Sequence, residues 1–364
     1  MSVRDDRGPI RAIDHVLRDN GLEGIQEEPF PNDGWSGASL TRLRRSGGDR
    51  LILKRDSLAR DWIARATNDG PLLREAWFAA RSRLVADGTS GAIRASYLDV
   101  GRDGDGVGIL MPDLTGVLFD WEKPISIEAL DRVLAGIAAM HAQSGMYWSG
   151  MATADETESA PWCPIRERIT LICRSSIECP GPAHDAVADR ILPGWDAFGR
   201  LASRSARDLI SMLGDDPQPL VDVLSAQPRT LIHGDLKLAN VGIAAGGAIE
   251  TIDWQMVSIA PIAIEIGWFL VANVASLPVE PDEVIRRYRT HLAKGYLDSD
   301  DGWLRGNDFE DDGVDAAVLV GLLLRGWRKG LDANTGITLG SGVTARDDLA
   351  WWCERALEAA DRIL

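Results

Sequence analysis

The sequence contains no apolar run that approaches the ~20 consecutive residues of a membrane-spanning helix. Its first residues, 1–7, are polar and lack the apolar segment of a secretory signal peptide. These two absences argue against a membrane protein and against a secreted one. We therefore expect a cytoplasmic protein without a membrane partner.

Cysteine is scarce, with 4 residues in a chain of 364 (Cys163, Cys173, Cys179 and Cys353). Their positions lack the spacing of metal ligands, so we expect reduced, structural thiols rather than a zinc site or a disulfide framework. Internal repeats and long low-complexity segments are also missing. A chain of this length without such features is long enough for two or more lobes with hydrophobic cores.

Basic residues are in the minority, since 39 Lys and Arg stand against 55 Asp and Glu, a formal net charge of −16. This balance excludes the basic faces of nucleic-acid-binding proteins. An acidic cleft would attract a cationic ligand, although acidity serves solubility as well. Tryptophan is frequent, with 13 residues against 6 Phe and 4 Tyr. Most should be core residues, and one or two could line a pocket for a cation.

One segment carries the chemistry of phosphoryl transfer. In Leu231–Asn240, Asp235 follows His-Gly and precedes Asn240 by five positions, and Asp253 follows within Thr251–Trp254. Phosphoryl transfer needs a carboxylate that orients and deprotonates a hydroxyl, which suits Asp235. It also needs an amide oxygen and a second carboxylate for Mg²⁺, which suits Asn240 and Asp253. The alternative is that these residues only cap turns.

His233-Gly234-Asp235 with Asn240 and then Ile252-Asp253-Trp254 resembles the aminoglycoside phosphotransferase and choline kinase-like family of small-molecule kinases. The resemblance implies an α+β, two-lobed, protein-kinase-like fold. Residues 1–112 would form a nucleotide-binding lobe with an antiparallel β-sheet and a helix. Residues 113–364 would form a mainly helical catalytic lobe, with a helical insertion at about 145–230.

Within the N-terminal lobe, residues 25–53 read as strands, with a small-residue turn at 33–39. The resemblance assigns Gly34, Ser36 and Gly37 of this turn to the phosphates of ATP, although the turn does not match G-x-G-x-x-G. Lys54, at the end of the third strand, would pair with the phosphates, and Glu75 would orient it. The alternatives are a solvated lysine, with Arg55 as its competitor, and a surface glutamate.

The resemblance also implies a hinge between the lobes that holds adenine. Met111 would back the ring, while the Asp113 carbonyl and the Leu114 amide would bond its edge. Because such contacts come mostly from the backbone, GTP is not excluded as the nucleotide. The other reading of this segment is a plain edge strand that runs into a loop.

The hydrophobic pattern predicts further elements. His141, at the end of a predicted helix, is interpreted as a packed structural residue, and Glu265 as a brace for the catalytic loop. The predicted strands are 93–100 and 107–111, and the predicted helices are 11–20, 58–65, 69–84, 127–141, 165–177, 185–191, 195–213, 283–293, 314–329 and 346–364. An acidic run at 298–312 is a solvated loop or a rim that attracts cations.

The function predicted from these features is an ATP- and Mg²⁺-dependent transfer of the γ-phosphate to a hydroxyl of a small molecule. A cationic acceptor, such as an aminoglycoside-type antibiotic or an amino sugar, is favoured by the acidic balance and would imply antibiotic resistance. A sugar, a choline-like amine or homoserine remains open as acceptor, as does a catalytically silent nucleotide-binding regulator. Monomer and dimer are left undecided.

Overall fold

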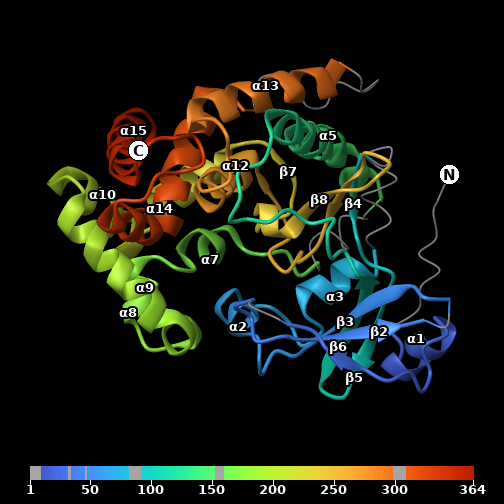
Figure 1. Cartoon of the computed structure of the whole chain (residues 1–364). Coiled ribbons are helices and arrows are strands. Elements are labelled where there is room, and N and C mark those ends of the chain that lie inside the picture. Colours follow the sequence, from blue (N-terminus) through green and yellow to red (C-terminus); the bar gives the residue numbers. More distant parts are fainter. Residues whose placement is uncertain (1–9, 32–33, 46, 82–91, 152–159, 298–308) are drawn as a thin grey trace.

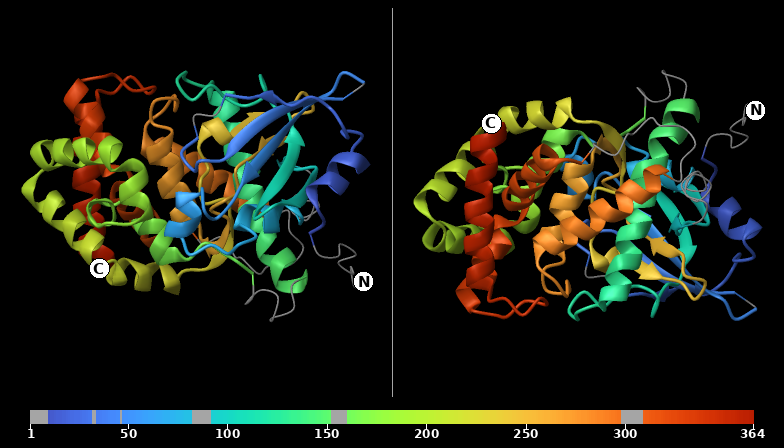
Figure 2. Two further views of the ribbon diagram at one scale, coloured as in Figure 1. Left: turned by 90° about the horizontal axis from the view of Figure 1, so that it is seen from below. Right: turned by 90° about the horizontal axis from the view of Figure 1, so that it is seen from above.

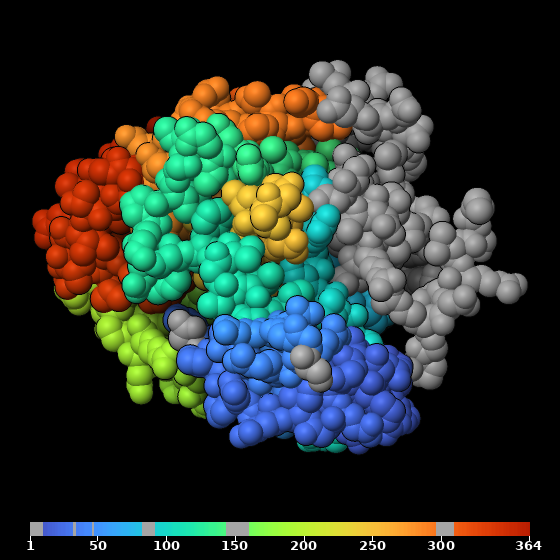
Figure 3. Space-filling view, turned by 45° about the vertical axis from the view of Figure 1, so that its right-hand side comes forward, coloured from blue at the N-terminus to red at the C-terminus, as the bar shows by residue number. Residues whose placement is uncertain are grey.

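The computed structural model describes residues 10–31, 34–45, 47–81, 92–151, 160–297 and 309–364. Figure 1 shows a sheet-rich N-terminal part, in blue and cyan, and a larger helical part, in green to red. Figure 2 shows the same division from below and from above. In Figure 3 the blue N-terminal residues pack directly against the teal chain that follows the sheet. This mixed, two-lobed architecture confirms the predicted fold class.

The N-terminal sheet is antiparallel throughout. Its strand order is β1 (Glu28–Pro29), β2 (Ser39–Arg44), β3 (Arg50–Asp56), β6 (Gly106–Pro112) and β5 (Asp99–Asp103). Side chains of β3 alternate between two faces. Leu51 and Leu53 pack with α1 (Ile13–Asp19), whereas Ile52 joins the main core with α3 (Arg74–Ala79). Lys54 follows this alternation and lies on the α3 face.

The strand predicted at 93–100 is wrong as a single element. The structure has a short β4 (Ile93–Ala95), which pairs in parallel with β9 (Ile249–Thr251), and a separate β5 in the N-terminal sheet. Between them, the Ser96 amide donates to the Thr251 carbonyl, so the chain changes sheets at this point. This crossover joins the N-terminal sheet to the strand that precedes Asp253. The lobe boundary at residue 112 stays a prediction.

The helical part is organised around α14 (Asp311–Thr335), which packs against α9 (Pro182–Leu201), α12 (Ile262–Ala272) and α15 (Ala345–Ile363). The other helices are α2 (Trp62–Ala66), α5 (Ile127–Met151), α7 (Ile165–Thr170), α8 (Arg174–Glu178), α10 (Arg204–Asp215), α11 (Gln218–Ala226) and α13 (Pro281–Leu297). Among the described residues, no helix is both long enough and apolar enough to cross a membrane. The four cysteines are unpaired.

Several predicted helix boundaries are wrong. The helix expected at 69–84 begins only at Arg74, because Leu73 has a φ of 51° and the Asp69 carboxylate accepts from the Arg74 amide. The helix expected at 165–177 is divided into α7 and α8. The break expected near Pro193 is absent, since α9 continues through this residue, and the break lies instead before α10. Residues 82–91 and 298–308 lie outside the described part of the chain, and with them most of the predicted acidic rim.

Candidate active site

The segment around Asp235, residues 233–240, which we call the HGD loop, connects the end of β7 (Arg229–Ile232) to β8 (Val241–Ile243). Gly234 has a φ of +78°, and a Cβ atom there would lie 2.2 Å from the Met256 carbonyl oxygen. Only glycine fits such a position without strain. A ring nitrogen of His233 (Nε2) lies 2.9 Å from the Ile252 carbonyl oxygen, which ties the loop to the segment before Asp253.

Glu265, in the first half of α12, supports this loop through hydrogen bonds to its backbone, as expected. Its carboxylate is fully buried and accepts hydrogen bonds from the amides of His233 (2.5 Å) and Gly234 (3.2 Å). Although burial opposes the charge, His141, His233 and the His233 amide lower the pKa of Glu265. His141 itself is buried and lies 2.6 Å from the Tyr288 hydroxyl, which agrees with a packed, structural histidine.

Asp235 lies between two side chains that come from the same loop. The Lys237 ammonium is 3.1 Å from Asp235 Oδ2, and the Asn240 amide nitrogen donates to the Asp235 carbonyl at 3.0 Å and to Oδ2 at 3.3 Å. The Lys237 side chain is partly exposed, and Asp235 and Asp253 raise its pKa. Sequence reasoning missed Lys237, although a lysine two positions after the aspartate was a usable signal.

Lys54 connects the two lobes. Its ammonium nitrogen lies 2.6 Å from Glu75 Oε2 on α3 and 2.7 Å from Asp253 Oδ1. Burial opposes the charge on Lys54, but the two carboxylates raise its pKa well above the ordinary value. Tyr97 completes the group, because its hydroxyl donates to Glu75 Oε1 at 2.8 Å and accepts from the Trp254 amide at 3.1 Å. Tyr97 was not singled out from the sequence.

Asp253 occupies a strained position. Its φ of 67° is unusual for a residue that is not glycine, and such outliers cluster at functional sites. Although burial opposes the charge, Lys54 and Lys237 lower the pKa of Asp253 to about 2. The next ring, that of Trp254, stacks on Phe78 of α3 with centroids 4.5 Å apart. The carboxylate is therefore ionised and held in one place.

The predicted phosphate turn reaches the helical part of the molecule. Gly37 has a φ of +95°, the Ser36 hydroxyl oxygen accepts from the Ala38 amide, and Gly34 precedes them in the same turn. The Trp35 carbonyl accepts from Trp62 Nε1 at 2.6 Å. The Trp35 ring lies 6.1 Å from the Trp327 ring on α14. The Arg190 guanidinium lies 5.8 Å from the same Trp35 ring.

The predicted hinge follows β6. Met111 is buried opposite Ile52, and the Asp113 amide donates to the Arg50 carbonyl. The Asp113 carboxylate is held by Arg42 at 2.8 Å, while the Leu114 carbonyl accepts from two amides of the following turn. The adenine contacts of Met111, Asp113 and Leu114 stay predictions.

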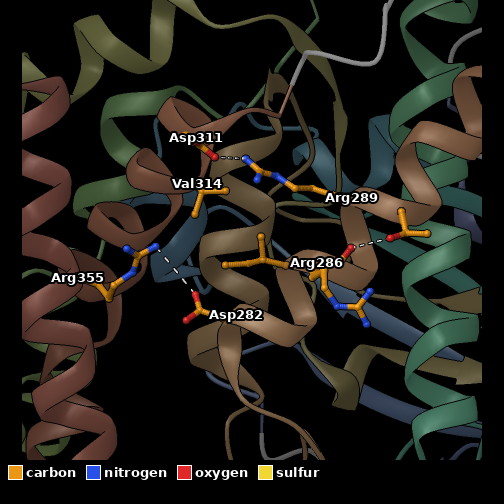
Figure 4. A pocket seen from close by; sticks show the side chains of 8 residues that line it. Asp282, Arg286, Arg289, Asp311, Val314 and Arg355 are labelled. Atoms are coloured by element: carbon orange, nitrogen blue, oxygen red, sulfur yellow. Dashed lines mark hydrogen bonds and ion pairs between the residues drawn. The ribbon is translucent and has the colours of Figure 1, made fainter.

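Two cavities of the described chain lie away from Asp235. The first, of about 470 Å³, lies between α13, α14 and α15, and Figure 4 shows that it is lined by charged side chains. These charges are paired with one another, Arg289 with Asp311 at 3.1 Å and Arg355 with Asp282 at 4.0 Å. The second, of about 460 Å³, lies between α8, α9 and α10. Neither cavity brings together the residues predicted from the motif.

Comparison with known proteins places this geometry in a family. A family model described as "Phosphotransferase enzyme family" matches residues 33–306. The solved AMP-bound complex of a spectinomycin phosphotransferase is similar in fold, with 15% identity and a TM-score of 0.51 over 89% of this chain and 90% of that chain. The structure of choline kinase LicA from Streptococcus pneumoniae shares 13% identity at a TM-score of 0.47, over 96% of this chain and 97% of that one.

No curated protein sequence matches the chain significantly. The low identities to solved structures restrict that likeness to the fold, so membership rests on the family model, which covers most of the chain. The chain therefore belongs to the phosphotransferase enzyme family, which confirms the family resemblance predicted from its motifs.

Proposed function

We propose that the protein transfers the γ-phosphate of ATP to a hydroxyl group of a small molecule. The observation that carries this proposal is the double contact of Lys54 with Glu75 (2.6 Å) and Asp253 (2.7 Å). A lysine held in this way presents its charge to phosphate groups beside the carboxylate that would hold their metal ion. Membership of the phosphotransferase family supports the reaction class.

In this proposal Asp235 accepts the proton of the acceptor hydroxyl. The hydroxyl oxygen forms a bond to the γ-phosphorus, the bond from that phosphorus to the β,γ-bridging oxygen breaks, and ADP leaves with the bonding electrons. Lys237, 3.1 Å from Asp235 Oδ2, is placed to balance charge on the transferred group. Such a reaction depends mainly on positioning and electrostatics, which a braced loop provides.

Asn240 and Asp253 fit a magnesium ion. The amide nitrogen of Asn240 is directed to Asp235, which turns its carbonyl oxygen away from that residue, and Asp253 is ionised. Such oxygens are the ligands that Mg²⁺ prefers. When bound, the ion supplies charge neutralisation at the phosphates. Among the described residues, no cluster of three or more His, Cys, Asp or Glu side chains forms an all-protein metal site, which agrees with an ion shared with phosphates.

The test is ADP release from Mg·ATP, measured with a panel of aminoglycosides, amino sugars, neutral sugars, sugar acids, choline-like amines and homoserine, with GTP as a second nucleotide. Asp235→Asn should reduce acceptor-dependent turnover by roughly 10²–10⁴-fold while nucleotide still binds. The matched control is Asp222→Asn, an exposed aspartate of α11 that bonds only Gln218 among the described residues. Turnover that survives in Asp235→Asn would contradict the proposal, and Mg·ATP binding without turnover on any acceptor would favour a silent regulator.

A further inference from the structure

Four mostly buried side chains lie together beside the HGD loop, and we call this group the Arg–Trp wall. They are Arg168 on α7, Trp268 on α12, and Arg325 and Trp327 on α14. The Trp268 ring lies between two guanidinium groups, 4.6 Å from that of Arg168 and 5.4 Å from that of Arg325. Arg325 also lies 5.1 Å from the Trp327 ring. Sequence reasoning identified none of these four residues.

The wall runs from the HGD loop to the phosphate turn. At one end, Arg168 Nε donates to the Gly234 carbonyl at 2.7 Å, next to Asp235. At the other end, the Trp327 ring meets that of Trp35 at 6.1 Å. An acceptor whose hydroxyl reaches Asp235, opposite the γ-phosphate, therefore has this wall as its neighbour.

The wall holds hydrogen-bond donors without acceptors. Within the described part of the chain, Nε1 of Trp268, Nε1 of Trp327 and Nε of Arg325 are buried and have no partner. Leaving a buried donor unsatisfied costs about 1–3 kcal/mol, so three in one place call for a ligand. The other unpartnered side-chain nitrogens lie outside the wall, in His141 of α5 and in Trp352 and Arg355 of α15.

The wall also carries positive charge that has no direct ion pair among the described residues. Arg168 and Arg325 form no ion pair with any described residue, although the charges of nearby carboxylates act on both. Asp235 is paired with Lys237 at 3.1 Å, and Asp332 with Arg328 at 2.9 Å. Burial and Arg328 lower the pKa of Arg325 to about 10 against the opposing charges of Asp332 and Asp235, so it stays a cation at neutral pH. Arg325 is only partly buried, so part of its side chain is exposed.

The helices that carry the wall are held tightly together. A Cβ atom on Gly267, next to Trp268, would lie 2.3 Å from the Ala317 carbonyl oxygen of α14. A Cβ atom on Gly194 of α9 would lie 2.4 Å from the Trp327 carbonyl oxygen. These close contacts restrict the movement of the wall, so its donors cannot easily turn inward to find partners.

We propose that the Arg–Trp wall binds an anionic group of the acceptor, a carboxylate or a phosphate, so that the acceptor is an acidic alcohol or sugar rather than an amine. This inference rests on the proposed function, because it assumes that the acceptor hydroxyl reaches Asp235. Two guanidinium groups and two indole N–H groups complement oxygen anions, and they repel the ammonium groups of an aminoglycoside.

The test uses three probes that share one sugar ring and differ in charge: D-glucuronate, D-glucose and D-glucosamine. Binding is measured by tryptophan fluorescence and by calorimetry, with Mg·AMP-PNP occupying the nucleotide site so that its phosphates are already in place. We expect D-glucuronate to bind most tightly and D-glucosamine most weakly. Inorganic phosphate in the same titration shows whether phosphate can replace the carboxylate.

Arg325→Gln should weaken D-glucuronate binding by about tenfold or more, because a charge-assisted hydrogen bond is lost. Trp268→Phe keeps the aromatic ring and removes one N–H donor, and should weaken binding by about threefold. The matched control is Arg355→Gln, since Arg355 also has an unpartnered Nε and lies 6.0 Å from the Trp351 ring, outside the wall. The control should bind D-glucuronate like the wild type.

Tightest binding of D-glucosamine, or no binding of any anionic probe at millimolar concentration, would overturn the inference. So would an Arg325→Gln variant that binds D-glucuronate normally but has a raised KM for Mg·ATP, because the guanidinium would then serve the nucleotide. Asp235-dependent phosphorylation of a hydroxyl group on an amine-bearing acceptor would agree with the proposed function. It would contradict only the inference that the acceptor is anionic. Failure of Mg·AMP-PNP to bind would instead count against the proposed function itself.

Discussion

The nucleotide side of the candidate site and the side of the Arg–Trp wall differ in whether their charged and polar groups have partners within the protein. On the nucleotide side, Lys54 is matched by Glu75 and Asp253, and the Tyr97 hydroxyl satisfies the second oxygen of Glu75. On the side of the Arg–Trp wall, Arg325 and two indole N–H groups have no acceptor among the described residues. The first side is satisfied by the fold, whereas the second is satisfied only when something else is bound.

This difference separates residues that hold the site together from residues that select a ligand. A matched buried pair is disturbed strongly when one partner is removed, because the other charge is left alone. An unmatched donor contributes little to folding and much to the choice of ligand. Removing a matched residue should therefore lower stability and turnover together, and removing an unmatched donor should weaken ligand binding without lowering stability.

The largest effect should follow Lys54→Met, which breaks the matched side. Glu75 and Asp253 would face each other without a cation, which should lower the free energy of unfolding by about 3–5 kcal/mol. Turnover should fall by roughly 10³-fold, since a charge at the phosphates is lost. Denaturant unfolding and ADP release measure the two effects. The control, Arg55→Gln, removes only partly exposed ion pairs with Glu27 and Asp103 and should change stability by less than about 1 kcal/mol.

Glu265→Gln should be next in size, because Glu265 supports the loop that both sides share. Two hydrogen bonds to a charged acceptor become weaker, with an expected loss of about 2 kcal/mol in unfolding free energy. Since the pKa of Glu265 is lowered, the advantage of the wild type is complete above the ordinary value of 4.5 and disappears as the pH falls through the lowered value. Glu265→Asp, which keeps the charge, should recover part of the loss, and equal stability of all three proteins would contradict the bracing role.

Asp61→Asn sharpens the comparison, because Asp61 is a buried carboxylate without a matched cation. Burial and neighbouring Asp56 raise its pKa from 3.8 to about 7. The folded protein thus holds a proton that the unfolded chain has lost, and wild-type stability falls as the pH rises from about 4 to 7. Asparagine can still cap α2, where Asp61 accepts from the Ala64 amide, so the variant should be more stable by about 2 kcal/mol above pH 7 and nearly equal near pH 4. The exposed Asp208→Asn should show no such pH dependence.

What could be predicted from the sequence also differs between the matched side and the unmatched side of the site. The HGD motif predicted a common site for Asp235, Asn240 and Asp253. The structure joins Asp235 to Asn240 by a hydrogen bond and Asp253 to Lys54, while the roles of the three residues stay predictions. Lys54 and Glu75 were found through the resemblance, and the structure places them together, while their roles stay predictions. What spacing could not show is the change of sheet after β4, since parallel pairing with β9 depends on a strand far along the chain.

The Arg–Trp wall could not be found in this way. Arg325 and Trp327 lie on a helix whose sequence pattern indicates burial but not which neighbour it meets. Pro193 shows the same limit, because the packing of α9 on α14 keeps the helix continuous through a residue that usually ends one. Residues that depend on tertiary packing between distant helices leave no local signal.

The smallest expected effect tests whether the two sides communicate. Trp35 belongs to the phosphate turn, yet its ring meets Trp327 of the wall at 6.1 Å and the Arg190 guanidinium at 5.8 Å. Trp35→Ala should lower the free energy of unfolding by about 1 kcal/mol, as for the loss of one aromatic contact, because the bond from Trp62 to its carbonyl survives. If the contact couples the sides, the apparent affinities for Mg·AMP-PNP and for D-glucuronate should each fall a few-fold. Trp121→Ala, at a tryptophan that is 45% exposed and outside both sides, is the control. Equal behaviour of the two variants would mean that the matched and the unmatched side act independently.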